Sequence, residues 1–333
     1  APEGFWIDRT EAEKITLTKD HTSVAPYGSI WPDTEMTVPV TLWVEKELKN
    51  MDGGSNVFVY LLTAKTAGAP TPEGGKSVAT VRDGQSVSFG ELTFAYSDLA
   101  GAAEKEFVYE ITESIPANKL LGVRYDTEKH TVRVKLAWDG KALTATADQG
   151  TETAPVHSVN VYESGYIRVQ KVKKGTDTGL EGAVFKVYSD EACQTEVDTL
   201  TSGQDGTALS KELPAGPYWI KEVTAPKGFN LDSTDPVPVT VTAAHTASAP
   251  IPVTFANTEK TADLTLWAKK TLKNLPSSTE EFTFSLTPVT DGAPMPASGT
   301  TVTVRTGETA TFSALHYTYS DLKGQDQQTA KVD

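Results

Sequence analysis

The chain has 333 residues, of which 38% are hydrophobic and 22% charged, so it is long enough for two or three domains with buried cores. Its 44 acidic and 30 basic residues give a net charge of −14, which argues against nucleic acid or an anionic membrane as a partner. A single cysteine, Cys193, excludes an internal disulfide and a multi-cysteine metal site. The five histidines lack metal-ligand spacing, and we find no nucleotide-binding loop and no nucleophile motif. We therefore expect no turnover enzyme, no cofactor and no metal, and the apolar runs are too short for a membrane span.

An internal repeat organises the chain. Ala1-Pro2-Glu3-Gly4-Phe5 aligns with Ala225-Pro-Lys-Gly-Phe229, 224 positions later, and Thr41-Leu42-Trp43 returns at 265–267. After one deletion the offset is 223, which pairs Tyr96-Ser97-Asp98-Leu99 with residues 319–322. We interpret the chain as a window on a tandem array. Residues 1–36 would end one module, 37–163 and 164–260 would be complete modules, and 261–333 would begin another.

The predicted elements are almost all strands. A helical turn is expected at 100–106, and period-two alternation then predicts strands at 131–136, 237–242 and 301–305. Turn clusters such as Asp139-Gly140 and Asp205-Gly206 separate the strands. We therefore predict the all-β class, in the form of tandem β-sandwich modules joined by linkers of a few residues.

Strand alternation places three residue types on the core face, where they are unexpected. The alternation predicts that three polar side chains of each complete module face the core. They are a lysine near the first strand, a glutamate in the middle and an asparagine at the last strand. Asn160 has weaker support, because Val159 and Val161 compete for the core face. The residues are Lys46, Lys171 and Lys270, Glu113 and Glu222, and Asn160 and Asn257.

Two interpretations of these residues remain open. One is a buried Lys–Glu salt bridge capped by an amide, because isolated buried charges are costly. In the other, burial favours a neutral amine and a protonated carboxylic acid. The amine then attacks the side-chain carbonyl of Asn while Glu polarises it and carries protons to the departing ammonia. The product is an isopeptide bond, formed once per module.

Residues 164–260 resemble a collagen-adhesin B-type domain. The resemblance rests on Gly165-Tyr-Ile-Arg-Val-Gln-Lys171, Gly179-Leu-Glu-Gly-Ala-Val-Phe185, Tyr218-Trp-Ile-Lys-Glu222-Val-Thr-Ala-Pro-Lys-Gly-Phe229 and Val253-Thr-Phe-Ala-Asn257. It implies a prealbumin-like or immunoglobulin-like β-sandwich with a Lys171–Asn257 isopeptide bond and Glu222 as its catalyst.

Residues 37–163 resemble the streptococcal pilin isopeptide-linkage domain. The marks are Leu42-Trp-Val-Glu-Lys46, Phe107-Val-Tyr-Glu-Ile-Thr-Glu113, Val123-Arg-Tyr-Asp126 and Val159-Asn-Val-Tyr162, with Val161 where Thr is usual. The resemblance implies that Lys46 joins Asn160 and that Glu113 assists.

The partial modules carry two further cross-link candidates. Asp33 stands at the repeat position of Asn257, and an Asp can form the bond by losing water. Lys270 matches Lys46. We expect neither to cross-link within this chain, since their partners lie outside it.

Both families occur in Gram-positive surface proteins, so the resemblance implies a structural stalk in a linear array at the bacterial surface, anchored to the cell wall through regions outside this chain. Its partners would be neighbouring repeats and, through a head domain outside the chain, a host ligand. The alternatives are a sortase-assembled pilus shaft subunit and a matrix- or glycan-binding module. Stacking surfaces for the latter would come from the tryptophans, which are Trp6, Trp31, Trp43, Trp138, Trp219 and Trp267.

Cross-links between first and last strands would close long loops. Lys46 and Asn160 lie 114 positions apart, and Lys171 and Asn257 lie 86 apart. By analogy with disulfides, each bond should stabilise its module by about 4–5 kcal/mol.

Overall fold

The computed structural model describes residues 1–12, 14, 32–274, 279–323, 327 and 329. The chain divides into two compact units, Ala1–Glu163 and Ser164–Asp333. In the described part of the chain, no helix has the length and apolar character needed to cross a bilayer. His21 and Trp31 lie outside the described residues.

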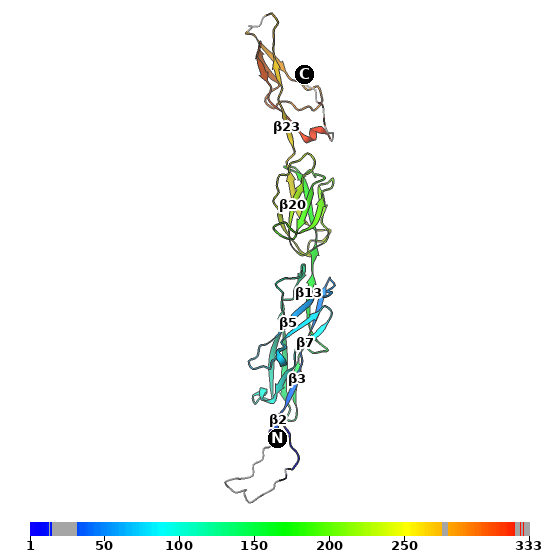
Figure 1. Ribbon diagram of the computed structural model, residues 1–333, viewed down its shortest axis with the longest axis vertical. Coiled ribbons are helices and arrows are strands. Elements are labelled where there is room, and N and C mark those ends of the chain that lie inside the picture. The colour runs from blue at the N-terminus through cyan, green and yellow to red at the C-terminus, as the bar shows by residue number, and fades with distance from the viewer. Residues whose placement is uncertain (13, 15–31, 275–278, 324–326, 328, 330–333) are drawn as a thin grey trace. The chain divides into compact units, whose positions relative to one another are not determined.

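Strands make up most of the regular structure in the described part of the first unit (Figure 1). Its elements in chain order are β1 (Phe5–Ile7), β2 (Asp33–Glu35), β3 (Thr37–Val40), β4 (Trp43–Lys49), β5 (Val57–Ala64), η1 (Glu73–Gly75), β6 (Val78–Arg82), β7 (Ser86–Ser88), β8 (Leu92–Ala95), η2 (Tyr96–Leu99), β9 (Glu104–Glu113), β10 (Val123–Arg124), β11 (His130–Trp138), β12 (Leu143–Ala147) and β13 (Val156–Tyr162).

Two sheets of this unit form a sandwich. One has the strand order β10-β13-β4-β7, and the other has the order β12-β11-β9-β5-β6. Strands β4 and β13, near the two ends of the module, pair in parallel, whereas the pairs within the second sheet are antiparallel. Between the sheets lies one apolar cluster to which both contribute, for example Val44 of β4 and Tyr109 of β9. Alternating burial along β4 and β9 places every second side chain in this core.

The helical turn of the first unit differs from the sequence prediction. It is a 3-10 helix at Tyr96–Leu99, whereas Glu104, inside the predicted turn at 100–106, already begins β9. The Asp98 carboxylate accepts a hydrogen bond from the Ala95 N–H at 2.8 Å, which satisfies a backbone donor at the start of the turn. Ala100 then ends it with a left-handed backbone (φ 52°).

The second unit is also built of strands (Figure 1). Its elements are β14 (Ser164–Gly165), β15 (Ile167–Lys173), β16 (Val184–Tyr188), β17 (Glu196–Thr201), β18 (Thr207–Leu209), β19 (Leu213–Pro214), β20 (Gly216–Thr224), β21 (Val237–Val241), β22 (Ile251–Asn257), β23 (Thr261–Leu264), β24 (Trp267–Lys269), β25 (Glu281–Ser285), β26 (Thr301–Arg305), β27 (Thr309–Thr311), β28 (Leu315–Thr318) and η3 (Tyr319–Leu322).

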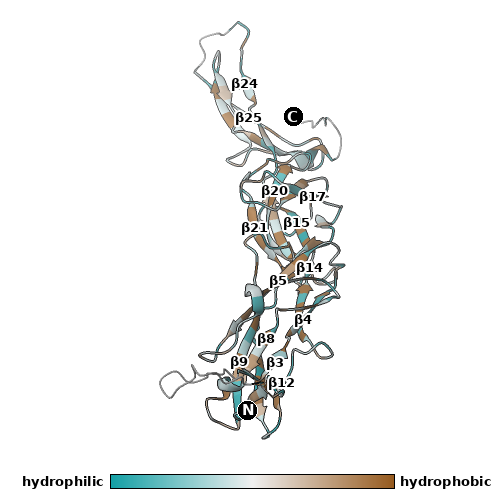
Figure 2. Ribbon diagram, turned by 60° about the horizontal axis from the view of Figure 1, so that its bottom comes forward, coloured by the Kyte–Doolittle hydropathy of each residue, from teal (hydrophilic) through white to brown (hydrophobic). Residues whose placement is uncertain are grey.

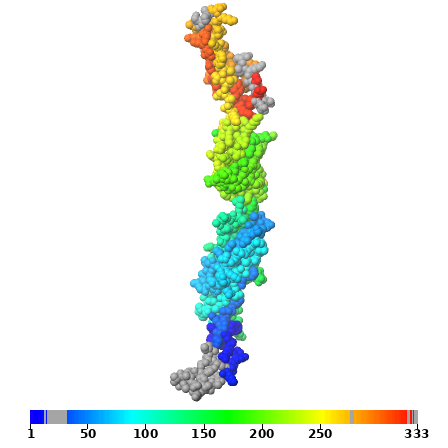
Figure 3. Space-filling model, in the orientation of Figure 1, coloured from blue at the N-terminus to red at the C-terminus, as the bar shows by residue number. Residues whose placement is uncertain are grey.

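Residues 164–260 again form a sandwich of two sheets, with the orders β18-β15-β22 and β17-β16-β20-β21. As in the first unit, the early strand β15 and the late strand β22 pair in parallel. Phe185 and Phe255 meet in the core with ring centroids 4.9 Å apart. Hydrophobic and hydrophilic residues alternate along the strands (Figure 2), and the face of this module seen in Figure 3 has no deep cleft.

The described residues of the last segment, 261–274 and 279–323, form three two-stranded sheets, which are β23-β28, β24-β27 and β25-β26. Their core is a small cluster around Leu286, Phe312 and Leu315. The predicted all-β class with tandem β-sandwich modules is confirmed in both units.

Candidate functional sites

The first Lys–Glu–Asn cluster lies in the core of the first unit. Lys46, in the middle of β4, and Asn160, on the neighbouring strand β13, are both 0% exposed. Glu113 ends β9 in the opposite sheet, and its side chain is 1% exposed. The polar side chains thus meet between the sheets, as strand parity predicts for Lys46 and Glu113.

Glu113 bridges the other two side chains. Lys46 Nζ donates a hydrogen bond to Glu113 Oε2 at 2.8 Å, and Asn160 Nδ2 donates to Glu113 Oε1 at 2.9 Å. One carboxylate therefore holds the amine and the NH₂ group of the amide at the same time, one on each oxygen.

An aromatic wall encloses the amine of this cluster. Lys46 Nζ lies 4.7 Å from the ring centroid of Phe58 and 5.8 Å from that of Tyr60, whose hydroxyl lies 3.4 Å from Glu113 Oε2. Burial lowers the pKa of Lys46, although the hydrogen bond and the charge of Glu113 oppose the shift. Burial also raises the pKa of Tyr60, so its hydroxyl stays protonated.

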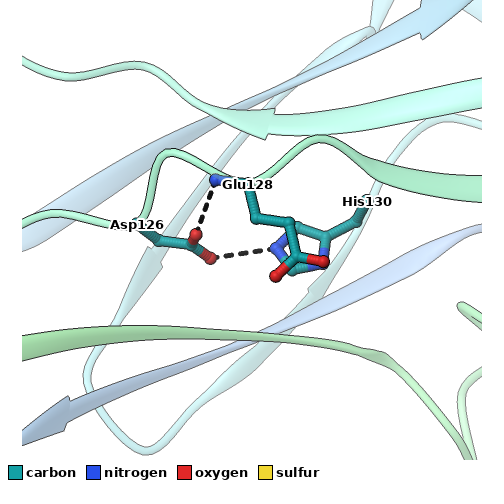
Figure 4. A group of neighbouring side chains, drawn as sticks. All are labelled: Asp126, Glu128 and His130. Carbon is teal, nitrogen blue, oxygen red and sulfur yellow. Dashed lines mark hydrogen bonds and ion pairs between the residues drawn. The ribbon is translucent and has the colours of Figure 1, made fainter.

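The carbonyl side of Asn160 has its own donor. The backbone N–H of Asp126 donates to Asn160 Oδ1 at 2.7 Å. The Asp126 side chain fixes this loop, because its Oδ2 accepts from Ser158 Oγ at 2.7 Å and lies 2.9 Å from His130 Nε2. Its Oδ1 accepts from the N–H of Glu128 at 2.8 Å (Figure 4). Burial tends to raise the pKa of Asp126, but the hydrogen bonds from Ser158 and His130 hold it below its ordinary value.

Asp126, Glu128 and His130 also offer ligand atoms within 4.8 Å of one another. Both Asp126 oxygens already accept hydrogen bonds from the protein. The trio therefore works as a hydrogen-bonded support for the Asp126 loop (Figure 4). The sequence motif that contains Asp126 predicts no role for this residue, because strand parity does not show which loop N–H reaches the amide of Asn160.

The second cluster repeats the arrangement in residues 164–260. Lys171 on β15 is 0% exposed, Asn257 at the end of β22 is 1% exposed, and Glu222 on β20 of the opposite sheet is 2% exposed. Lys171 Nζ donates to Glu222 Oε2 at 3.1 Å, and Asn257 Nδ2 donates to Glu222 Oε1 at 2.7 Å. Burial again lowers the pKa of the lysine, against the opposing charge of Glu222.

The two clusters share a strand register. In the parallel pair β4–β13, Lys46 lies opposite Ser158, so Asn160 is two residues further along. In the pair β15–β22, Lys171 lies opposite Phe255, and Asn257 is again two residues further. Two residues along a strand keep the side chain on the same face, which is why lysine and asparagine both point at the glutamate.

The candidates of the partial modules lie apart from these clusters. Asp33 is exposed and begins β2, where it pairs with Ile7 of β1. Lys270 is half-buried, and its Nζ lies 4.6 Å from the ring centroid of Phe282. Phe282 is the repeat counterpart of Phe58, so Lys270 keeps one contact of Lys46.

The tryptophans that the structure describes differ in how far they are exposed to solvent. Trp267 is 67% exposed and Trp6 is 57% exposed, whereas Trp43 and Trp219 are half-buried. Trp138 donates through Nε1 to Glu3 Oε1 at 2.6 Å and packs edge-on against Tyr96. Cys193 is a free, partly buried thiol in the turn that follows β16.

Two domain families match the chain. Residues 165–254 match SpaA, the prealbumin-like fold domain, and residues 42–163 match FctA, the Spy0128-like isopeptide containing domain. The FctA match contains Lys46, Glu113 and Asn160. The SpaA match contains Lys171 and Glu222 and ends three residues before Asn257.

One curated protein matches a shorter stretch of the sequence. The trypsin-resistant surface T6 protein of Streptococcus pyogenes serotype M6 is 36% identical over 75 residues, which are 22% of this chain and 13% of that protein. The matched segment is thus a small part of that relative's length.

The chain is similar to a number of solved structures, of which three are examples. The major pilin T-13 of S. pyogenes shares 14% identity over 67% of this chain and 99% of that chain, with a TM-score of 0.38. The Bacillus anthracis TIE protein shares 16% over 84% and 50%, with a TM-score of 0.35. A streptococcal ancillary pilin shares 21% over 78% and 76%, with a TM-score of 0.30.

Proposed function

Since the chain is a tandem of pilin-type isopeptide-domain modules, one of SpaA type and one of FctA type, we propose that it is a load-bearing segment of a bacterial surface stalk or fibre. Each complete module is closed by its own Lys–Asn isopeptide bond. The single observation that carries the proposal is the glutamate held between a buried lysine and a buried asparagine, which occurs twice with the same strand register.

The reaction begins with a proton transfer from the lysine ammonium to the glutamate that accepts its hydrogen bond. The neutral amine then attacks Cγ of the asparagine, and the C–N bond to the amide nitrogen breaks as the new C–N bond forms. The glutamic acid gives its proton to the leaving nitrogen, which departs as ammonia. The glutamate then takes up the surplus proton of the attacking nitrogen, which becomes the isopeptide N–H, and it ends the reaction protonated. No outside reactant is consumed, and the products are one isopeptide bond and one ammonia.

The geometry suits each step of this sequence. The NH₂ group of Asn160 faces Glu113, which places the proton donor beside the leaving group. The N–H of Asp126 faces the carbonyl oxygen, where negative charge develops during the attack. Both are in place before the reaction, so the fold supplies orientation.

A cavity of about 250 Å³ borders the first cluster. Glu113, Phe58 and Tyr125 belong to its lining. The cavity gives the departing ammonia a path out of the core. Because lysine and asparagine are consumed, each module reacts once and the chain is not a turnover enzyme.

The proposed setting is the surface of a Gram-positive cell, with attachment to the cell wall through regions outside this chain. Neighbouring repeats of the same chain are its first partners, and a host ligand bound by a head domain outside this chain is a further one. The 224-residue repeat favours consecutive segments of one long chain. A pilus shaft built of separate subunits is the second candidate, favoured by the pilins among the similar structures.

The test of the chemistry is the intact mass of the unfolded chain. We expect a deficit of two ammonia molecules, with Lys46 mapped to Asn160 and Lys171 mapped to Asn257. Glu113→Ala and Glu222→Ala should each restore one ammonia. Glu110→Ala, on the same strand as Glu113 but outside the cluster, is the matched control and should keep the deficit. A full sequence mass in the parent chain would overturn the proposal.

A further inference from the structure

Two repeated motifs have no part in the cross-linking clusters. The first is Ala-Pro-x-Gly-Phe, at residues 1–5 and 225–229, and the second is Tyr-Ser-Asp-Leu, at η2 and η3. In each unit, one copy of the first motif meets the copy of the second that follows it in the chain. The same contacts therefore occur twice, at places 224 and 223 residues apart.

The second unit shows the contact between Gly228 and Tyr319. Gly228 has a left-handed backbone (φ 86°), and a Cβ built on it would lie 2.0 Å from the nearest ring carbon of Tyr319. The carbonyl of Gly228 accepts from the N–H of Lys260 at 2.8 Å. The carbonyl of Lys260 in turn accepts from the N–H of Tyr319 at 3.0 Å. Only glycine fits this position, for both its φ and its space.

The first unit repeats the contact with Gly4 and Tyr96. Gly4 also has a φ of 86°, and its built Cβ would lie 2.2 Å from the ring of Tyr96. Met36 takes the place of Lys260, with the same two backbone hydrogen bonds at 2.8 and 3.0 Å. Because Met36 and Lys260 have different side chains, the feature that is repeated is the pair of backbone hydrogen bonds.

A glutamate completes each contact. Glu259 accepts from the N–H of Ser320 at 2.6 Å and from its hydroxyl at 2.5 Å, and Glu35 accepts from the N–H of Ser97 at 2.6 Å. Glu259 is only 6% exposed, and its other oxygen holds Lys173 Nζ at 2.5 Å. A buried carboxylate with three donors is a fixed group, because charge-assisted hydrogen bonds are about twice as strong as neutral ones.

We propose that these contacts are a built joint, in which the 3-10 turn of an FctA-type module is the docking surface for the SpaA-type module that precedes it in the same chain. The glycine leaves room for the tyrosine ring to pack against the backbone, and the glutamate accepts a hydrogen bond from the N–H of the serine in the 3-10 helix. The partner is an SpaA-type module with glycine and glutamate at these two positions. The inference does not depend on the isopeptide bonds.

The joint is tied to the two strands that carry the second cluster. Lys173 lies two residues after Lys171, and Glu259 lies two residues after Asn257. The Lys173–Glu259 ion pair therefore links the ends of the paired strands β15 and β22. Glu259 also accepts a hydrogen bond from Ser320 of the next module. A load leaving the SpaA-type module enters the next one through residues anchored to both strands.

The test uses the full chain and pulsed electron paramagnetic resonance. One spin label is placed on the native Cys193 and a second on Thr303→Cys, an exposed position of β26. We expect one narrow distance distribution in the parent chain and a broad one in Gly228→Ala. Gly182→Ala is the matched control, since its φ is 84° and no atom lies within 4 Å of its built Cβ. A broad parent distribution, or an unchanged one in Gly228→Ala, would overturn the joint.

The first unit provides an independent readout. Gly4→Ala should speed amide hydrogen exchange at Ser97 by about tenfold or more, because the loss of a hydrogen bond to a charged group costs at least that factor. Gly140→Ala (φ 91°, open space at the built Cβ) should leave the exchange unchanged. If Gly228→Ala also loses hydrogen-exchange protection in β20 or β22, the variant has destabilised residues 164–260 themselves. Tyr319→Ala then replaces it in the experiment, because this substitution changes only the module that follows. Equal exchange in Gly4→Ala and Gly140→Ala would count against the joint.

Discussion

Asp126 connects two networks in the first unit, with its backbone facing Asn160 and its side chain facing Ser158 and His130. The side chain has no contact of its own with the amide that would react. Its contribution to the proposed chemistry is to hold one N–H at the carbonyl oxygen, which makes it a positioning residue.

We predict that Asp126→Ala slows ammonia loss in the first unit by about tenfold to a hundredfold, since a misplaced donor stabilises the developing oxyanion less. The measurement is time-resolved intact mass with peptide mapping after refolding. Residues 164–260 serve as the internal control and should react at the parent rate. Asp126→Asn, which keeps one of the two acceptor oxygens, should recover part of the rate. Equal rates in Asp126→Ala and the parent would remove Asp126 from the mechanism.

The charge of Asp126 also predicts a pH dependence. Its folded pKa is lowered, so its stabilising effect is complete above the unfolded value of about 4 and is lost as the pH falls through the lowered pKa. Exchange at the Glu128 N–H, which donates to Asp126, should rise relative to its intrinsic rate in that acid range. A protection factor that stays flat on acidification until the unit itself unfolds would contradict this.

Much of the clusters could be predicted residue by residue, and the reason is their parity. Along their strands, the inward-facing apolar side chains are followed at the same parity by Lys46, Glu113, Lys171 and Glu222. A charged side chain is buried in this way only when the core holds a partner for it. Asn160 was less certain because the valines on either side of it compete for the core face. Asp126 could not be found this way, because its role depends on a loop conformation.

At the scale of elements, the parallel pairs β4–β13 and β15–β22 decide which side chains meet. Alternation predicts that strands exist but not which strand lies beside which, so this pairing is a property of the closed sandwich. The helical turn predicted at 100–106 was wrong for a related reason. The residues before it form the turn, and tertiary pairing with β5 and β11 draws Glu104 and its successors into β9.

A glycine beside β15 can be used to test whether the exact position of this strand matters for the proposed reaction. Gly206 has a φ of 80°, its carbonyl accepts from the N–H of Lys171, and its built Cβ would lie 2.2 Å from the carbonyl oxygen of Lys171. Gly175 has nearly the same φ, 79°, with open space around the built Cβ. The two glycines therefore separate backbone strain from displacement of the strand.

We predict that Gly175→Ala costs about 1–2 kcal/mol, the cost of the left-handed backbone alone. Gly206→Ala should cost more and should also slow ammonia loss from Asn257, because the strand bearing Lys171 must shift. Thermal unfolding and intact mass measure the two effects. Equal behaviour of the two variants would mean that the position of β15 is not critical.

At the scale of the whole molecule, the proposed cross-links would decide how far the chain can be stretched. With Lys171 joined to Asn257, the 86 positions between them are bypassed when the chain is pulled from its ends. The same holds for the 114 positions between Lys46 and Asn160. Tension then passes along the parallel strand pairs.

Single-molecule stretching should show this directly. We predict that Glu222→Ala adds an extension of about 300 Å that the parent chain lacks, which is the contour length released between Lys171 and Asn257. Glu113→Ala should add about 400 Å by the same reasoning. Extensions of these lengths in the parent chain would contradict a load-bearing role for the bonds.

The parallel pairing of an early strand with the last strand of each module has a consequence for proteolytic damage. In an ordinary sandwich, a protease that cuts an exposed turn such as the one at Cys193 leaves two pieces held only by noncovalent contacts. With a bond between β15 and β22, a cut anywhere between Lys171 and Asn257 leaves both pieces covalently attached, and the chain stays continuous from one neighbour to the next. Every loop between the two strands is then dispensable for continuity, so a module can be nicked in service without severing the stalk.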